Sequence, residues 1–110
     1  MTLSEIKTAL SLELVCGEAD EREWNTVYAG DLLSRAMSHV KADNLWVTIM
    51  SNTNVIAVAS LTEAAAVILA EGVELLPEAK AAAEENGITV FSSKMTVYEL
   101  CVNIADAQNS

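Results

Sequence analysis

Short apolar runs alternate along the chain with segments whose apolar residues recur at helical spacing. Runs rich in β-branched and aromatic residues predict strands, whereas a period near 3.6 predicts helices. The most apolar run, Leu45–Met50, is apolar at both alternating sets of positions and therefore predicts a strand covered on both faces. The pattern predicts strands over 12–16, 24–29, 45–50, 65–70 and 88–91, and helices over 5–10, 32–40, 55–61, 77–85 and 95–107. This alternation predicts an α/β fold in which helices flank a mixed or partly parallel central sheet.

Polar and breaker residues mark the expected ends of the helices. Ser4 is expected to cap the first helix and Asp31 the second, because Ser and Asp side chains accept hydrogen bonds from free helical N–H groups. The pair Ser92-Ser93 is expected to cap the last helix. Pro77 is typical of a first helical turn, and Asn86-Gly87 of a helix end.

The chain has 110 residues, which fits a single domain over 1–110 with one core. Its formal net charge of −10 argues against binding to nucleic acid or to an anionic membrane. The N-terminus does not have the basic and then apolar pattern of a secretion signal, so a cytoplasmic location is expected.

The residues that most often carry catalysis or bind metals are few. His39 is the single histidine, and it is expected on the surface at a helix end. Cys16 and Cys101 lie far apart in sequence, and two thiolates cannot hold an iron–sulfur cluster or a cysteine-rich zinc site. Both are expected to be small buried apolar residues. No glycine-rich phosphate loop or nucleophile elbow is present, so we expect no metal, no cofactor and no enzymatic activity.

Polar side chains gather where predicted strands pass into predicted helices. Ligands of α/β proteins settle beyond the carboxyl ends of strands, where helix N-termini offer N–H groups to anions, although the same residue types also cap helices for stability alone. The candidate ligand-binding residues at the three junctions are Asp31, Ser34, Thr48, Asn52, Asn54, Ser92, Ser93 and Thr96. Three such junctions together favour the ligand interpretation, provided that they converge in space.

Two segments resemble a known family. Tyr28-Ala-Gly-Asp-Leu-Leu-Ser34 is similar to a Tyr-Ala-Ser-Asp-Leu-Leu-Ser segment of DRTGG domains, and residues 45–59 are similar to their Trp-x-Thr strand and Asn-Ile-x-Ala-Val-Ala helix. Residues 87–93 and the helix after them resemble the closing strand and helix of the same family. The chain thus resembles a stand-alone DRTGG domain, similar to the N-terminal domain of HPr kinase/phosphorylase.

One departure concerns the string that gives the family its name. Arg22 and Thr26 lie near its expected place, but Asn25-Thr-Val27 occupies that stretch and no glycine pair follows. Glycine pairs permit left-handed backbone or a close approach of a ligand, so a contact of the family through that turn is in doubt here.

The resemblance implies a regulatory role. Such domains lie beside nucleotide-sensing CBS domains or ahead of a phosphotransacetylase and lack recognised catalytic residues, and some single-domain relatives are labelled hydrogenase-associated or iron–sulfur proteins. Our first hypothesis is a homodimeric regulatory or accessory module that binds a small anionic metabolite or nucleotide. The alternative is a ligand-free subunit that docks on a redox or hydrogenase-type complex, with Trp24 as an exposed anchor. An enzyme would need Asp31 as a general base assisted by Ser34 or Thr48.

Overall fold

The computed structural model describes all 110 residues, and a five-stranded sheet forms its centre. The strand order is β1-β5-β4-β3-β2. The adjacent pairs β2–β3, β3–β4 and β4–β5 are parallel, and β1 pairs antiparallel with β5. The strands are β1 (Glu13–Cys16), β2 (Val27–Ala29), β3 (Leu45–Thr48), β4 (Ala66–Leu69) and β5 (Val90–Ser92). The predicted mixed, partly parallel sheet is therefore confirmed.

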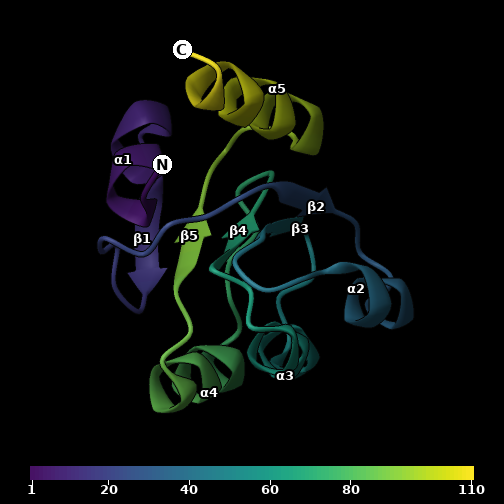
Figure 1. The fold of residues 1–110 in the computed structure, drawn as a ribbon. Helices are drawn as coiled ribbons and strands as arrows, with labels where there is room; N and C mark the ends of the chain where they lie inside the picture. The colour runs from purple at the N-terminus through teal and green to yellow at the C-terminus, as the bar shows by residue number, and fades with distance from the viewer.

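Five helices cover the two faces of this sheet. They are α1 (Leu3–Leu10), α2 (Leu33–His39), α3 (Thr53–Thr62), α4 (Pro77–Asn86) and α5 (Val97–Gln108). Figure 1 shows α1 and α5 on one face, and α2, α3 and α4 on the other. The fold class is α/β with three layers, as predicted. No helix of the fold has both the length and the apolar character needed to cross a lipid bilayer.

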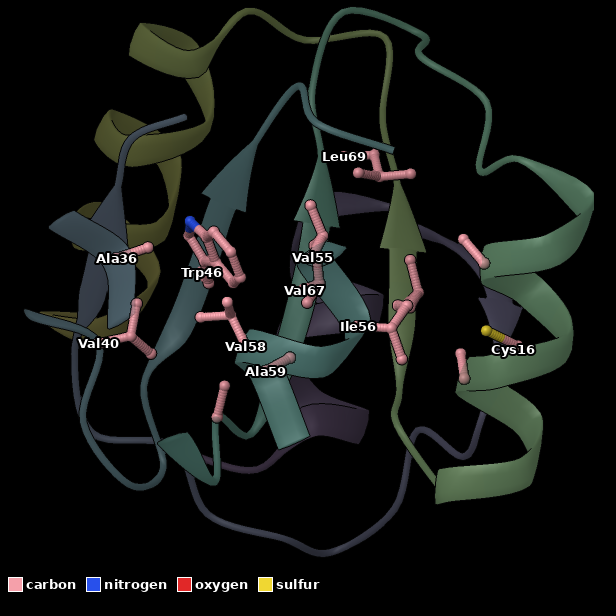
Figure 2. Packing of buried hydrophobic residues seen from close by; sticks show 14 residues of the cluster. Cys16, Ala36, Val40, Trp46, Val55, Ile56, Val58, Ala59, Val67 and Leu69 are labelled. Carbon is pink, nitrogen blue, oxygen red and sulfur yellow. The ribbon is translucent and has the colours of Figure 1, made fainter. Parts of the chain in front are cut away.

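The core consists of two apolar clusters, one on each face of the sheet. Successive side chains of a strand point to opposite faces, so Trp46 of β3 joins one cluster and Val47 joins the other. In Figure 2, Trp46 and Val67 of the sheet lie among residues of α3 such as Val58. Strands β3 and β4 are buried at every position because helices cover both of their faces.

Strand β2 is shorter than the composition of residues 24–29 predicts. The expected strand over 24–29 begins only at Val27. The backbone N–H of Trp24 donates to the carbonyl of Met1 at 3.1 Å, and Glu23 forms an isolated bridge with Thr2. Residues 23 and 24 therefore pair with the N-terminal segment, and this long-range contact overrides the strand propensity.

The first helix begins at a different cap from the one predicted. Thr2, and not Ser4, is the N-cap of α1, and its side-chain oxygen accepts from the N–H of Glu5 at 3.1 Å. The Glu5 carboxylate in turn accepts from the N–H of Thr2 at 2.9 Å. This reciprocal pair is a capping box, and its hydrogen bonds lower the pKa of Glu5.

The last helix repeats the same arrangement. Ser92-Ser93 was the predicted cap, but Thr96 caps α5, and Thr96 and Glu99 form the second capping box. Ser92 ends β5, and the Ser93 hydroxyl accepts from the N–H of Met95 at 3.0 Å. The two serines therefore lie partly exposed at the end of β5, and neither is the N-cap of α5.

Candidate functional site

The parallel strands bring the three polar junctions to one edge of the sheet. Thr48 of β3 is in register with Leu69 of β4, and Leu69 is in register with Ser92 of β5. Adjacent strands lie about 4.8 Å apart, so the ends of β3 and β5 are separated by roughly 10 Å. The junctions therefore share an edge but form two groups, one on each side of β4.

The first group is built around Asp31, which does not cap α2 as predicted. The N-cap position of α2 is Leu32, which makes no side-chain cap hydrogen bond. The Asp31 carboxylate instead accepts from the Thr48 hydroxyl at 2.8 Å and from the N–H of Ile49 at 3.0 Å. Thr48 is fully buried and its oxygen also accepts from the N–H of Met50. These bonds tie the loop after β2 to the end of β3.

The remaining residues of this group serve the helices that follow. Asn52 is the N-cap of α3, and its side chain accepts from the N–H of Asn54 at 3.1 Å. Ser34 lies exposed in the first turn of α2, and its carbonyl accepts from Ser38. The hydrogen bonds of Asp31, Thr48 and Asn52 therefore hold loops and a helix end in place.

The second group opens into a cleft with a volume of about 380 Å³ beside the end of β5. Ser92 and Ser93 line it, whereas Thr96 is the cap of α5 and lies outside the lining. The loop from β4 to α4 closes one side, because the N–H of Gly72 donates to the carbonyl of Ser93 at 2.9 Å. The lining residues are Glu13, Val15, Gly72, Val73, Glu74, Leu75, Lys80, Ser92, Ser93 and Lys94, and we call this site the Lys80–Lys94 cleft.

Two lysines supply the cations of this cleft, and Glu13 and Glu74 in the same lining supply two carboxylates. Lys80 extends from α4 and Lys94 follows the two serines, and both are exposed. The two ion pairs of the fold lie elsewhere, so neither ammonium group is paired with a carboxylate. The Ser92 hydroxyl is half-buried and makes no hydrogen bond within the chain, unlike that of Ser93. The cleft thus presents two cations and a free hydroxyl.

Sequence reasoning identified the serines of the cleft but not its lysines. Lys94 follows Ser92-Ser93 directly, and a cation next to two hydroxyls at a strand end was a readable signal. Lys80 lies 14 residues from Lys94 in sequence and reaches the same cleft only because α4 packs beside β1 and β5.

Two other surface clefts are less suited to an anion. A larger groove of about 530 Å³ lies between α1 and α5, and it has no lysine or arginine in its lining. The other, of about 450 Å³, contains Glu18, Asp20 and Glu84 together with Arg22. Arg22 already donates to the Asp43 carboxylate and to the carbonyl of Glu63. The first groove is larger, but the Lys80–Lys94 cleft is the one that contains two unpaired ammonium groups.

The other candidate residues occupy structural positions. Cys16 is buried and Cys101 is half-buried, and burial raises the pKa of both thiols. No group of three or more metal-ligating side chains comes together in the fold. His39 is exposed at the end of α2, as predicted, where it stacks on Tyr28 with ring centroids 6.1 Å apart.

Trp24 is not the exposed anchor that the docking hypothesis suggested. Only 4% of its surface is exposed, and it packs in the cluster beneath α1 and α5. Its indole N–H is buried without a hydrogen-bond partner. Trp24 shares that cluster with Leu3 and Ile6 of α1, which makes it part of the core.

Comparisons with known proteins agree with the fold. The chain is similar to the crystal structure of the CBS and DRTGG domains of the regulatory region of Clostridium perfringens pyrophosphatase, complexed with the activator diadenosine tetraphosphate. The TM-score is 0.79 and the identity is 15%, over 96% of this chain and 46% of that chain. The likeness extends to the fold, and this chain spans about half the length of that structure. No curated protein gives a significant match. The family model of the DRTGG domain matches residues 5–107, and the chain therefore belongs to the DRTGG domain family.

Proposed function

We propose that this DRTGG domain is a non-enzymatic regulatory module that binds a small anionic metabolite or nucleotide in the Lys80–Lys94 cleft. The observation that carries the proposal is the meeting of two unpaired ammonium groups and the free Ser92 hydroxyl in one cleft. They do so on a chain whose net charge is −10 and which has only six basic residues. The pyrophosphatase regulatory region, which shares the fold, was crystallised with a nucleotide activator.

The expected affinity follows from the exposure of the two lysines. Two unit charges 4 Å apart attract by about 1 kcal/mol in water, and by about 4 kcal/mol at the effective dielectric of a protein surface. Two exposed ammonium groups and one hydroxyl therefore support a total of roughly 4 kcal/mol, which corresponds to a Kd on the order of 1 mM. Salt screens exposed charges, so the affinity should fall as ionic strength rises.

A thermal-shift titration tests this proposal. Phosphate, acetyl phosphate and adenine nucleotides are added at constant ionic strength, with chloride as the reference anion. With a Kd near 1 mM, 10 mM ligand stabilises the native state by about 1.4 kcal/mol. For 110 residues this raises Tm by about 6 °C.

Charge-matched variants locate the binding. The double variant Lys80→Gln, Lys94→Gln should lose the shift, whereas the double variant Arg35→Gln, Lys41→Gln removes two exposed cations outside the lining and should keep it. A shift of equal size in all three proteins would contradict the proposed site. No shift with any anion would contradict the proposed function.

The proposal includes a homodimer, which is supported by apolar side chains on the surface. Leu32, Leu61 and Tyr98 are 65%, 69% and 76% exposed. Exposed apolar side chains that stand singly are common, whereas contiguous exposed apolar patches are typical of interaction surfaces. Sedimentation equilibrium at micromolar concentration should give twice the monomer mass, and a monomer mass would refute this part of the proposal.

A further inference from the structure

The Lys80–Lys94 cleft also contains acidic groups, and these restrict the chemistry of its ligand. Glu13 of β1 is the cross-strand partner of Ser92, so its side chain leaves the sheet beside the free hydroxyl. Glu74, in the loop between β4 and α4, lines the same cleft. A carboxylate accepts hydrogen bonds and an ammonium donates them. A ligand that uses the whole cleft therefore needs an anionic, acceptor-rich group and also hydrogen-bond donors.

The apolar part of the lining is small and aliphatic. Val15, Val73 and Leu75 supply it, and no aromatic side chain is present. Proteins commonly hold nucleobases by stacking them on aromatic or arginine planes, and this cleft offers neither. Its volume of about 380 Å³ is near the lower end of the range for small-molecule sites. The cleft therefore lacks a platform for a base.

We propose that the ligand of this cleft is a phosphorylated sugar or polyol and that a nucleobase adds nothing to its recognition. The inference rests on the proposed function, since it names the ligand class of that same site. The phosphate group contacts the ammonium groups of Lys80 and Lys94 and accepts from the Ser92 hydroxyl. The hydroxyl groups of the ligand donate to the carboxylates of Glu13 and Glu74. A phosphate offers acceptors to both ammonium groups and to the Ser92 hydroxyl at once, which a simple carboxylate with two oxygens does not, and the ligand hydroxyl groups occupy the carboxylates of Glu13 and Glu74.

Calorimetric titration of the full chain with four probes tests this inference. The probes are inorganic phosphate, ribose 5-phosphate, AMP and ribose. Hydrogen bonds to the carboxylates should make ribose 5-phosphate bind about tenfold more tightly than inorganic phosphate. AMP should bind no more tightly than ribose 5-phosphate, and ribose alone should not bind measurably.

The outcomes separate this inference from the function on which it rests. If ribose 5-phosphate gains less than threefold over phosphate, or if AMP exceeds ribose 5-phosphate by more than threefold, the sugar phosphate class is wrong and the anion site stands. If no phosphate-bearing probe binds, the proposed function fails and this inference fails with it.

A carboxylate variant gives a readout that electrostatics alone would not produce. Glu74→Ala removes an exposed loop carboxylate from the cleft, while Glu78→Ala removes an exposed carboxylate of α4 outside the lining. We expect Glu74→Ala to strengthen phosphate binding, because repulsion falls, and to reduce the preference for ribose 5-phosphate toward unity. If Glu74 acted only through its charge, both affinities would rise by the same factor, and an unchanged preference would overturn its assigned role. Glu78→Ala should leave the preference at about tenfold.

Discussion

Replacing Thr48 by Val tests whether the hydrogen bonds between Asp31 and β3 are structural. The substitution nearly preserves volume but removes the hydroxyl that donates to Asp31 at 2.8 Å and accepts from the N–H of Met50 at 3.1 Å. Thr48 is fully buried, so water cannot replace it directly. Losing the bond to an exposed carboxylate costs about 1 kcal/mol, and leaving the partly buried N–H without its acceptor costs about another 1 kcal/mol.

The resulting loss of about 2 kcal/mol is large enough to measure by thermal unfolding. Unfolding entropy is roughly 2.1 cal/mol/K per residue, or about 0.23 kcal/mol/K for this chain, so Tm should fall by about 9 °C. Thr53→Val is the matched control, because Thr53 is exposed at the first position of α3. The control should change Tm by less than about 2 °C. If Thr48→Val lowered Tm by less than about 3 °C, the structural role of these hydrogen bonds would be refuted.

Three other predictions concern the core, the backbone and the helix ends. Trp24→Ala should destabilise the fold by about 3–5 kcal/mol in urea unfolding because the ring is buried, and a loss under 1 kcal/mol would contradict its place in the core. Gly17 has φ +81°, and an added Cβ would lie 2.5 Å from the Cα of Thr89, so Gly17→Ala should cost about 2–5 kcal/mol. Gly87→Ala, at φ +66° with no atom within 4 Å, should cost only about 1–2 kcal/mol, and equal losses would show that the contact at Gly17 does not matter. The hydrogen bonds of the capping box hold the pKa of Glu99 below its usual value, so its stabilisation is present above about pH 4.3 and is lost as pH falls through the folded pKa. The Tm difference between the wild type and Glu99→Ala should therefore shrink on acidification, and a constant difference down to about pH 2 would contradict this linkage.

Local rules predicted those parts of the fold that local chemistry determines. Pro77 begins α4, and Gly87 ends it with left-handed backbone, as the positional preferences of these residues predict. The apolar run that begins at Leu45 forms a fully buried interior strand. In each case the residues that form the element also carry the sequence pattern that predicts it.

Two of the three wrong helix caps, those of α1 and α5, had a sequence signal that a simple search for hydroxyl residues overlooks. Thr2 and Thr96 are each followed three positions later by glutamate, whereas Ser4 and Ser92 are not. Only the former spacing allows the reciprocal hydrogen bonds of a capping box. The choice among several neighbouring Ser and Thr residues depends on that second partner.

The function of Asp31 and the composition of the cleft were beyond local rules. The Asp31 carboxylate makes no cap hydrogen bond to α2 and instead accepts from Thr48 at the end of β3, 17 residues later in the sequence. Lys80, on a helix, and Glu13, on the antiparallel edge strand, meet the end of β5 only in the folded chain. Strand order and helix packing bring these groups together, and neither can be read from the spacing of residues.

Amide chemical-shift mapping during a phosphate titration, with chloride held at matched ionic strength, tests the central claim most directly. The account predicts chemical-shift changes that saturate with a Kd on the order of 1 mM. They should be concentrated at residues 72–75 and 92–94, around the lining of the Lys80–Lys94 cleft. Shifts that cluster instead at residues 31–34 and 48–54, or no saturable shifts at all, would contradict it.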